Sequence, residues 1–497
     1  MSETQPAAPF CPPDRRIHVL VAAILASSMA FIDGSVLSIA TPAIRTDLGA
    51  SLSDAQWISN AYLLLLASLL LIGGAVGDRF GLRRIFSLGI ALFVGASMLC
   101  ALAPTPVFLI AARALQGAGA ALMVPGSLAI IAKAYPREAR GRAIGIWASA
   151  SAFTTIFGPI LGGFILTVFG EWSWRLVFAV NLPLGGAALA LLLLRVPRDA
   201  PSDRRRLDLV GGLLATAGLL VIALALTGVD GAPPTNLHLA VVGLPGLVIL
   251  GVFLWWEGRT PAPMLPLGLF LRPSFSGAQA LTLVLYFALN AQIFYLPMTL
   301  IGGWGLTAAE VSLIMLPFGA ILTVLAPVAG RLADRFGPAP LLTGGSVLVA
   351  LAFFAMGVTA PFENPWGFIL PAIVVLALGM GLIVSPLSTA VMTAVEDSET
   401  GIASGINNAV SRVAGLLAIA AMGSVAAFVF ERALGSYAEL PLFFGVPPET
   451  ALSAEAEAAR RAATGSAFAA IAYINAGLAA ASAAIAWFTQ ARAPQRS

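Results

Sequence analysis

The sequence predicts an all-α membrane protein with fourteen transmembrane helices. Of its 497 residues, 59% are hydrophobic and only 10% are charged, whereas a soluble domain carries about 25% charged residues. The apolar residues form continuous runs of about 20 between short polar segments, which is the length that crosses a bilayer as a helix. These runs lack the alternation typical of a membrane β-barrel.

The spans are expected at fourteen places, with bounds approximate to a few residues. They cover roughly residues 17–40, 55–77, 85–103, 107–134, 143–169, 175–194, 209–229, 238–257, 274–301, 309–329, 341–359, 367–395, 402–430 and 466–489. Between the last two spans, Thr450–Gly465 is expected to be a short surface helix that ends at Gly465.

The distribution of basic residues predicts the topology. With these spans, most of the 27 Lys and Arg residues lie on the same side as the N-terminus, as the positive-inside rule requires of a cytoplasmic face. We therefore expect a multi-pass protein of the cytoplasmic (inner) membrane with both termini in the cytoplasm.

Several functional classes do not fit the sequence. The net charge of +3 reflects topology-setting arginines and does not indicate a nucleic acid partner. Cys11 and Cys100 are the only cysteines and match no metal spacing or disulfide framework. No G-x-x-x-x-G-K-[ST] loop or convergent catalytic constellation is present. We expect no metal, no cofactor, no ATP hydrolysis and no enzyme activity.

Internal repeats divide the chain into two homologous halves. The segments Gly74–Gly81 and Gly330–Gly337 both end in Asp-Arg-Phe-Gly, and two fainter glycine pairs keep nearly the same separation of roughly 260 residues. We expect an N-terminal six-helix half (1–194), a two-helix insert with its flanking loops (195–273) and a C-terminal six-helix half (274–497).

Two charged residues lie inside apolar spans at similar depths. Asp33 is about 10 Å and Arg113 about 9 Å from the outer ends of their spans, at 1.5 Å per residue. A charge at a helix centre costs roughly 2.5–3.5 kcal/mol on insertion scales, so such residues pair or mark an ion pathway. We expect a proton-coupling pair. The alternatives are a purely structural ion pair and placement near lipid headgroups.

Five short motifs, in order along the chain, resemble those of one transporter family. They are the loop Gly74–Arg84, the fourth-span run Arg113–Gly117, the fifth-span run Gly158–Gly163, and the segments Trp172–Pro183 and Gly401–Gly415. Together they resemble the major facilitator superfamily, in particular its fourteen-helix drug:proton antiporter branch. Ser38 and Thr41 depart from that branch, because they replace the usual Asn and Leu of a first-span motif.

The resemblance implies a proton-coupled antiporter that exports amphipathic drugs or toxic compounds across the cytoplasmic membrane by alternating access. Its partners are then a small amphipathic substrate, protons and the lipid bilayer, and no periplasmic adaptor is indicated. Two alternatives stay open. One is a narrow-specificity exporter of a metabolite, siderophore or self-made antibiotic, and the other is a non-transporting membrane sensor or scaffold.

Three further sets of candidate site residues follow. The resemblance implies a conformational latch at Gly74, Asp78, Arg79, Gly81, Arg83, Arg84, Asp334 and Arg335. An antiporter kink with close helix contact is expected at Gly158, Pro159, Gly162 and Gly163. Polar and aromatic side chains within spans predict a substrate cavity at Asn60, Gln116, Tyr286, Asn290, Phe294, Asn408 and Arg412. The plainer alternatives are a topology-setting loop and ordinary helix packing.

Overall fold

The computed structural model describes residues 10–199, 207–227, 234–396, 399–448 and 450–490. Within these ranges every regular element is helical, and fourteen helical segments are long and apolar enough to cross a membrane. The all-α fold with fourteen spans, predicted from hydropathy, is therefore confirmed.

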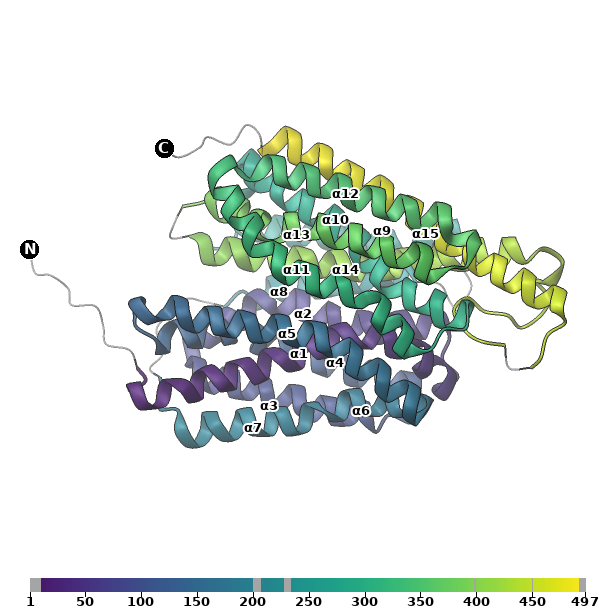
Figure 1. Cartoon of the computed structure of the whole chain (residues 1–497). Helices are drawn as coiled ribbons and strands as arrows, with labels where there is room; N and C mark the ends of the chain where they lie inside the picture. Colours follow the sequence, from purple (N-terminus) through teal and green to yellow (C-terminus); the bar gives the residue numbers. More distant parts are fainter. Residues whose placement is uncertain (1–9, 200–206, 228–233, 397–398, 449, 491–497) are drawn as a thin grey trace, which may run out of the picture.

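The first six spans pack together in one bundle (Figure 1, purple to blue). They are α1 (Arg16–Leu48), α2 (Leu52–Phe80), α3 (Leu82–Ala101), α4 (Pro106–Ala134), α5 (Arg137–Phe169) and the pair α6 (Trp174–Ala179) and α7 (Asn181–Arg195). The pair forms a single span that is interrupted at Val180.

The last six spans form a second bundle beside the first (Figure 1, green to yellow). They are α10 (Pro273–Met298), α11 (Ala308–Phe336), α12 (Pro338–Thr359), α13 (Leu370–Thr393), α14 (Thr400–Leu434) and α15 (Ala454–Gln490). The main contacts between the two bundles are those of α2 with α14, α5 with α11, and α1 with α10.

Equivalent helices of the two bundles begin and end with the same local signals. Both α2 and α11 contain 29 residues. Each starts with a capping box, at Ser51 in α2 and Thr307 in α11, which satisfies N–H groups that have no partner within the helix. Each is followed by a glycine with positive φ, Gly81 (97°) or Gly337 (80°), a conformation that side chains disfavour. These shared signals support the repeat seen in the sequence.

The two helices between the bundles lie at their shared edge. α8 (Leu209–Leu226) packs on α2 and α14, whereas the main partner of α9 (Asn236–Glu257) is α8. Large apolar side chains of α9, such as Leu244 and Leu247, are exposed. In a bilayer these side chains contact lipid.

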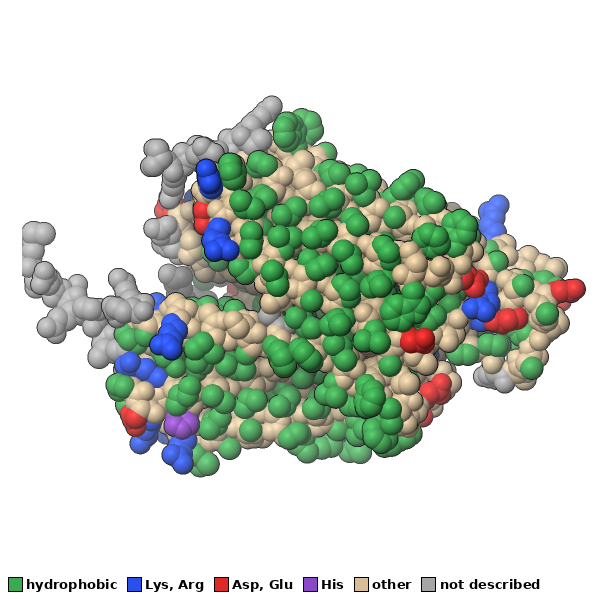
Figure 2. Space-filling model, in the orientation of Figure 1, with side chains coloured by type: hydrophobic (Ala, Val, Ile, Leu, Met, Phe, Trp, Pro, Cys, Tyr) green, Lys and Arg blue, Asp and Glu red, His purple; other side chains and the backbone are tan. Residues whose placement is uncertain are grey.

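The surface is divided as expected for a membrane protein. Figure 2 shows apolar side chains over the flank of the molecule and charged side chains gathered at its two ends. Such a band of apolar surface between charged ends matches the hydrocarbon layer and its two polar boundaries.

The last helix differs from the prediction. A separate surface helix ending at Gly465 was expected, but α15 runs unbroken from Ala454 to Gln490. Arg460 explains the difference, because it donates hydrogen bonds to the carbonyls of Gly302 (2.8 Å) and Gly303 (3.1 Å) beyond α10. A glycine inside a helix costs only about 1 kcal/mol relative to alanine, too little to end a helix anchored on both sides.

The placement of α8 and α9 yields a first prediction. No described residue within either helix lines the cavity between the bundles. Single cysteines along their interiors should therefore stay unreactive toward a water-soluble maleimide in native membranes. The native Cys11 and Cys100 are buried and should give little background labelling. Asn408→Cys, at the cavity wall, is the reactive control. A stripe of labelled positions on α8 or α9 would contradict the prediction.

Candidate functional site

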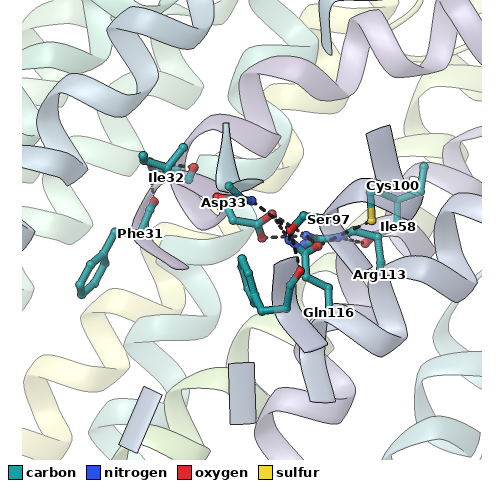
Figure 3. Close-up of polar contacts among 11 residues, drawn as sticks. Phe31, Ile32, Asp33, Ile58, Ser97, Cys100, Arg113 and Gln116 are labelled. Carbon is teal, nitrogen blue, oxygen red and sulfur yellow. Dashed lines mark hydrogen bonds and ion pairs between the residues drawn. The ribbon is translucent and has the colours of Figure 1, made fainter. Parts of the chain in front are cut away.

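A buried ion pair joins α1 and α4. Arg113 Nη1 lies 2.8 Å from Asp33 Oδ1 and 2.7 Å from Asp33 Oδ2, and both side chains are 1% exposed. Arg113 Nε also donates to the carbonyl oxygen of Ile58 on α2, at 3.0 Å. The two charges expected at one depth are thus in direct contact, and three helices meet at them (Figure 3).

Gln116 completes this cluster. Its Nε2 donates to Asp33 Oδ1 at 3.0 Å and to Ser97 Oγ on α3 at 2.9 Å. Its Oε1 accepts a 2.6 Å bond from Arg113 Nη1. The Asn181 side-chain amide donates to the same Ser97 hydroxyl, at 3.1 Å. The carboxylate therefore has two side-chain donors, and the network extends from α1 to the start of α7.

Aromatic rings cover the guanidinium group. The Arg113 Cζ atom lies 4.4 Å from the centre of the Tyr62 ring and 5.7 Å from that of Phe178. Such cation–π contacts contribute about 2 kcal/mol each when they are desolvated. Tyr62 and Arg113 also line the cavity between the bundles, whereas Asp33 does not. Asp33 is therefore shielded from the cavity by its own partner.

The cavity has a volume of about 1780 Å³ and is lined by both bundles. Its mouth includes Asp78 and Arg79 from the end of α2, Thr400 and Gly401 from the start of α14, and the loop Pro261–Pro266. These segments lie at the end of the molecule where α1 begins and α15 ends (Figure 1). Ligand pockets commonly measure about 300–1,000 Å³, so a large compound fits here.

The predicted cavity residues divide into two groups. Asn290, Phe294, Asn408 and Arg412 line the large cavity, and Tyr286 lines an adjoining recess of about 370 Å³ that shares Asn290, Asn408 and Arg412. Gln116 and Asn60 line neither space and are 0% exposed.

The prediction that Gln116 and Asn60 line the cavity is wrong. Gln116 follows Arg113 by one helical turn on α4, but its side chain contacts α1 and α3, and only Arg113 reaches the cavity. Both polar atoms of its amide already form hydrogen bonds, to Asp33, Arg113 and Ser97. Asn60 is buried, and neither atom of its amide forms a hydrogen bond with a described residue.

The opposite end of the cavity is closed by hydrogen bonds between the bundles. Gln56 Nε2 on α2 donates to the carbonyls of Ile419 (2.5 Å) and Ala420 (3.0 Å) on α14. Arg45 Nη1, buried at the end of α1, donates to the carbonyl of Phe444 at 2.6 Å. The cavity is therefore open at the end of the molecule where α1 begins and closed at the other end.

The glycine motif of α5 also lies at the closed end. A Cβ atom at Gly162 would overlap Val36 of α1, and one at Gly163 would overlap Ser312 of α11. The Ser312 hydroxyl donates to the carbonyl oxygen of Pro159, at 2.8 Å. The motif gives the close helix contacts that its spacing predicted, and it gives them on both sides of α5.

The loop between α2 and α3 depends on a residue that the sequence reasoning missed. Asp199 accepts hydrogen bonds from the backbone N–H groups of Leu82 and Arg83, both at 2.9 Å, and Lys133 Nζ lies 2.8 Å from its carboxylate. The carboxylate thus caps α3, where a negative charge is favourable. No spacing signal marks this acid, because only the fold brings it to α3.

Other latch residues differ in what they contact. Arg83 donates to the carbonyls of Leu192 (2.9 Å) and Leu193 (2.9 Å) at the end of α7, whereas Arg84 is exposed. Arg79 lies over the ring of Phe80, at 5.4 Å. The second loop repeats that stacking with Arg335 over Phe336, next to the exposed Asp334, although α12 has no side-chain cap.

Two bundles of six spans, a cavity open at one end and a buried ion pair beside it define a secondary transporter. The model of the Major Facilitator Superfamily matches residues 23–419, and the chain belongs to that family.

Its relatives include proteins that are named for the transport or export of an antibiotic and others that are named for multidrug resistance. The chain is 34% identical to the probable actinorhodin transporter of Streptomyces coelicolor, over 86% of this chain and 75% of the relative. It is 34% identical to a cephamycin export protein of Amycolatopsis lactamdurans, over 86% and 87%. The inward-facing, unoccupied bacterial homolog of the human lysosomal transporter Spinster matches with a TM-score of 0.69 over 97% of this chain and 98% of that one. That structure is 19% identical and supports the fold alone.

The close packing of α5 yields a second prediction. Gly163→Ala should weaken the closed end, because overpacking costs typically 1–3 kcal/mol. Cysteines at positions 167 and 309, where the Thr167 hydroxyl now accepts a 3.0 Å bond from the Ala309 N–H, should then cross-link at least about fivefold more slowly. Gly145→Ala on the same helix, with open space around it, is the control. Equal cross-linking in both variants would contradict this account of Gly163.

The Asp199 cap yields a third prediction. Burial by itself raises the pKa of Asp199, but Lys133 and the two backbone N–H groups outweigh it and lower that pKa overall. The carboxylate therefore stabilises the fold above its unfolded pKa, and this stability is lost only as the pH falls through the lower folded value. Asp199→Asn should lower the melting temperature in detergent by a constant amount between about pH 5.5 and 8. A difference that fades within this range would contradict the assignment.

Proposed function

We propose that this protein exports small amphipathic compounds across the cytoplasmic membrane in exchange for protons, by alternating access. The observation that carries the proposal is the buried cluster of Asp33, Arg113 and Gln116, with Arg113 at the wall of a large cavity open at one end. The antibiotic export named for the relatives supports the direction of transport.

The basic residues support the orientation. Arg79, Arg83 and Lys133 lie around the open end of the cavity, and the positive-inside rule assigns such an end to the cytoplasm. The conformer described here is then inward-facing, with both termini in the cytoplasm. Substrate enters from the cytoplasm or the inner leaflet.

Asp33 is the proposed proton acceptor. As a carboxylate it offsets the charge of Arg113, whose burial is otherwise costly. A proton on Asp33 removes that offset and weakens the bonds from Arg113 and Gln116, since charge-assisted bonds are roughly twice as strong as neutral ones. Because Arg113 lines the cavity, the change reaches the space where substrate binds, and proton binding is coupled to substrate binding.

Alternating access requires the closed end to open and the mouth to shut. The bonds from Gln56 and Arg45 to the second bundle must break in the outward-facing state. At the mouth, Asp78 and the start of α14 line opposite parts of one opening. We assign Asp78 and Arg79 to the latch that stabilises one of the two states.

A second candidate is export of one defined compound. Relatives that are named for a single antibiotic support narrow specificity, whereas relatives that are named as multidrug resistance proteins support broad specificity. A panel of chemically unrelated amphiphiles distinguishes the two candidates, since a broad exporter moves many of them and a narrow one moves few.

The proposal yields a fourth prediction. In everted vesicles, Asp33→Asn should reduce pH-gradient-driven dye uptake by more than about tenfold, equal to roughly 1.4 kcal/mol of coupling, while dye binding without a gradient persists. Asp47→Asn is the control, because Asp47 is another carboxylate of α1 but pairs with Arg175 at the helix end. Unchanged gradient-driven uptake by Asp33→Asn would exclude Asp33 as the coupling residue.

A further inference from the structure

Arg412 is a second intramembrane cation at the cavity. At 1.5 Å per residue it lies about 18 Å along α14 from the first residue of that helix, Thr400. It lines both the large cavity and the adjoining recess. The depth excludes a role as a topology-setting residue at the membrane surface.

The guanidinium of Arg412 has no partner in the described part of the protein. It forms no ion pair or hydrogen bond with any residue of the described ranges, in contrast to Arg113, which is neutralised by Asp33, and Arg460, which is paired with Glu457. An intramembrane charge costs several kcal/mol unless something offsets it. A site in which no described residue offsets such a charge is suited to an anionic guest.

Acidic residues are located away from Arg412. Among described residues, Asp78 and Asp208 are the only acids that line the large cavity. Both lie at its open end, at the end of α2 and just before α8. The recess beside Arg412 has no acidic lining residue within the described ranges, and Asp33 is bound to Arg113. The deep part of the cavity is therefore electropositive.

Polar groups beside Arg412 complete the site. The recess is lined by hydroxyl and amide side chains, namely Tyr286, Asn290, Ser388, Ser404, Asn407, Asn408 and Ser411. The Tyr286 hydroxyl forms no hydrogen bond with a described residue, although the carbonyl of Tyr286 accepts one from Asn290. Arg412 and this hydroxyl provide donors for two oxygens of one guest.

We propose that Arg412 and Tyr286 bind an acidic group of the substrate, so that the site selects anionic over cationic amphiphiles. The class is that of aromatic or alicyclic compounds bearing a carboxylate, sulfonate or ionised phenol. Arginine suits this role because its planar fork donates two bonds to one anion, and the low dielectric around it strengthens the attraction. The inference rests on the proposed export function, whose cavity it refines.

The test compares two dyes that share a xanthene ring and differ in charge. Fluorescein is an anion and pyronin Y is a cation at neutral pH. Binding to the purified full-length protein in detergent, without any ion gradient, is followed by fluorescence polarisation. The wild-type protein should bind fluorescein more tightly than pyronin Y. Arg412→Gln should weaken fluorescein binding at least about tenfold and leave pyronin Y binding equal or tighter.

Matched variants keep the test specific. Arg412→Lys retains the charge and should stay within about threefold of wild type for fluorescein, with a loss of the bidentate geometry. Arg432→Gln removes an exposed arginine near the end of the same helix and should change neither affinity. Melting temperatures of all variants verify folding.

The proposal is overturned by tighter binding of pyronin Y to the wild type, by unchanged fluorescein binding in Arg412→Gln, or by equal weakening of both dyes. Because no gradient is applied, a protein that binds fluorescein through Arg412 but fails to transport it would refute the export function and leave the anion site standing. Proton-driven export of cations that does not depend on Arg412 would support the export function and refute the anion site.

Discussion

The structure depends on holding charges where water cannot reach them. Asp33 and Arg113 each offset the cost of burying the other's charge within the membrane. Removal of one partner of a buried pair typically costs 3–5 kcal/mol of stability. The pair also organises its surroundings, since Arg113 bonds to α2 and Gln116 connects Asp33 to α3. In the proposed exchange, the contacts that stabilise the N-terminal bundle are also those that a proton on Asp33 weakens.

The two bundles have the same arrangement of helices but different charged residues within the membrane. The capping boxes of α2 and α11 and the glycines that follow them are retained in both halves, because they determine where helices begin and end. The ion pair is not repeated: position 375, the counterpart of Arg113, is a valine. The C-terminal bundle instead presents Arg412 to the cavity. The two bundles therefore differ in their intramembrane cations, since Arg113 is paired with Asp33 and Arg412 has no ion-pair partner among the described residues.

Much of this could be predicted from the sequence, because a bilayer leaves few alternatives. Hydropathy alone predicts the spans, and a lone charge in an apolar run predicts a partner, as with Asp33 and Arg113. The sequence predicts Gln116 at the cavity because residue spacing along α4 determines which residues share a face of the helix, but not which helices that face contacts. Asp199 was missed because its partners on α3 and α4 are distant in sequence. The sequence predicts a helix end at Gly465 because the bond of Arg460 to the segment that follows α10 carries no local signal.

The positive charge of Arg412 at the cavity also has an electrical consequence for the proposed exchange. When one anion leaves a cell and one proton enters, both movements carry positive charge inward, so two elementary charges cross the membrane per cycle. A membrane potential supplies about 2.3 kcal/mol per elementary charge for each 100 mV. Exchange of a monovalent cation for one proton would move no net charge and would gain nothing from the potential. In the proposed exchange, the positive charge of Arg412 selects the charge of the substrate and thereby determines whether the membrane potential, in addition to the pH gradient, drives transport.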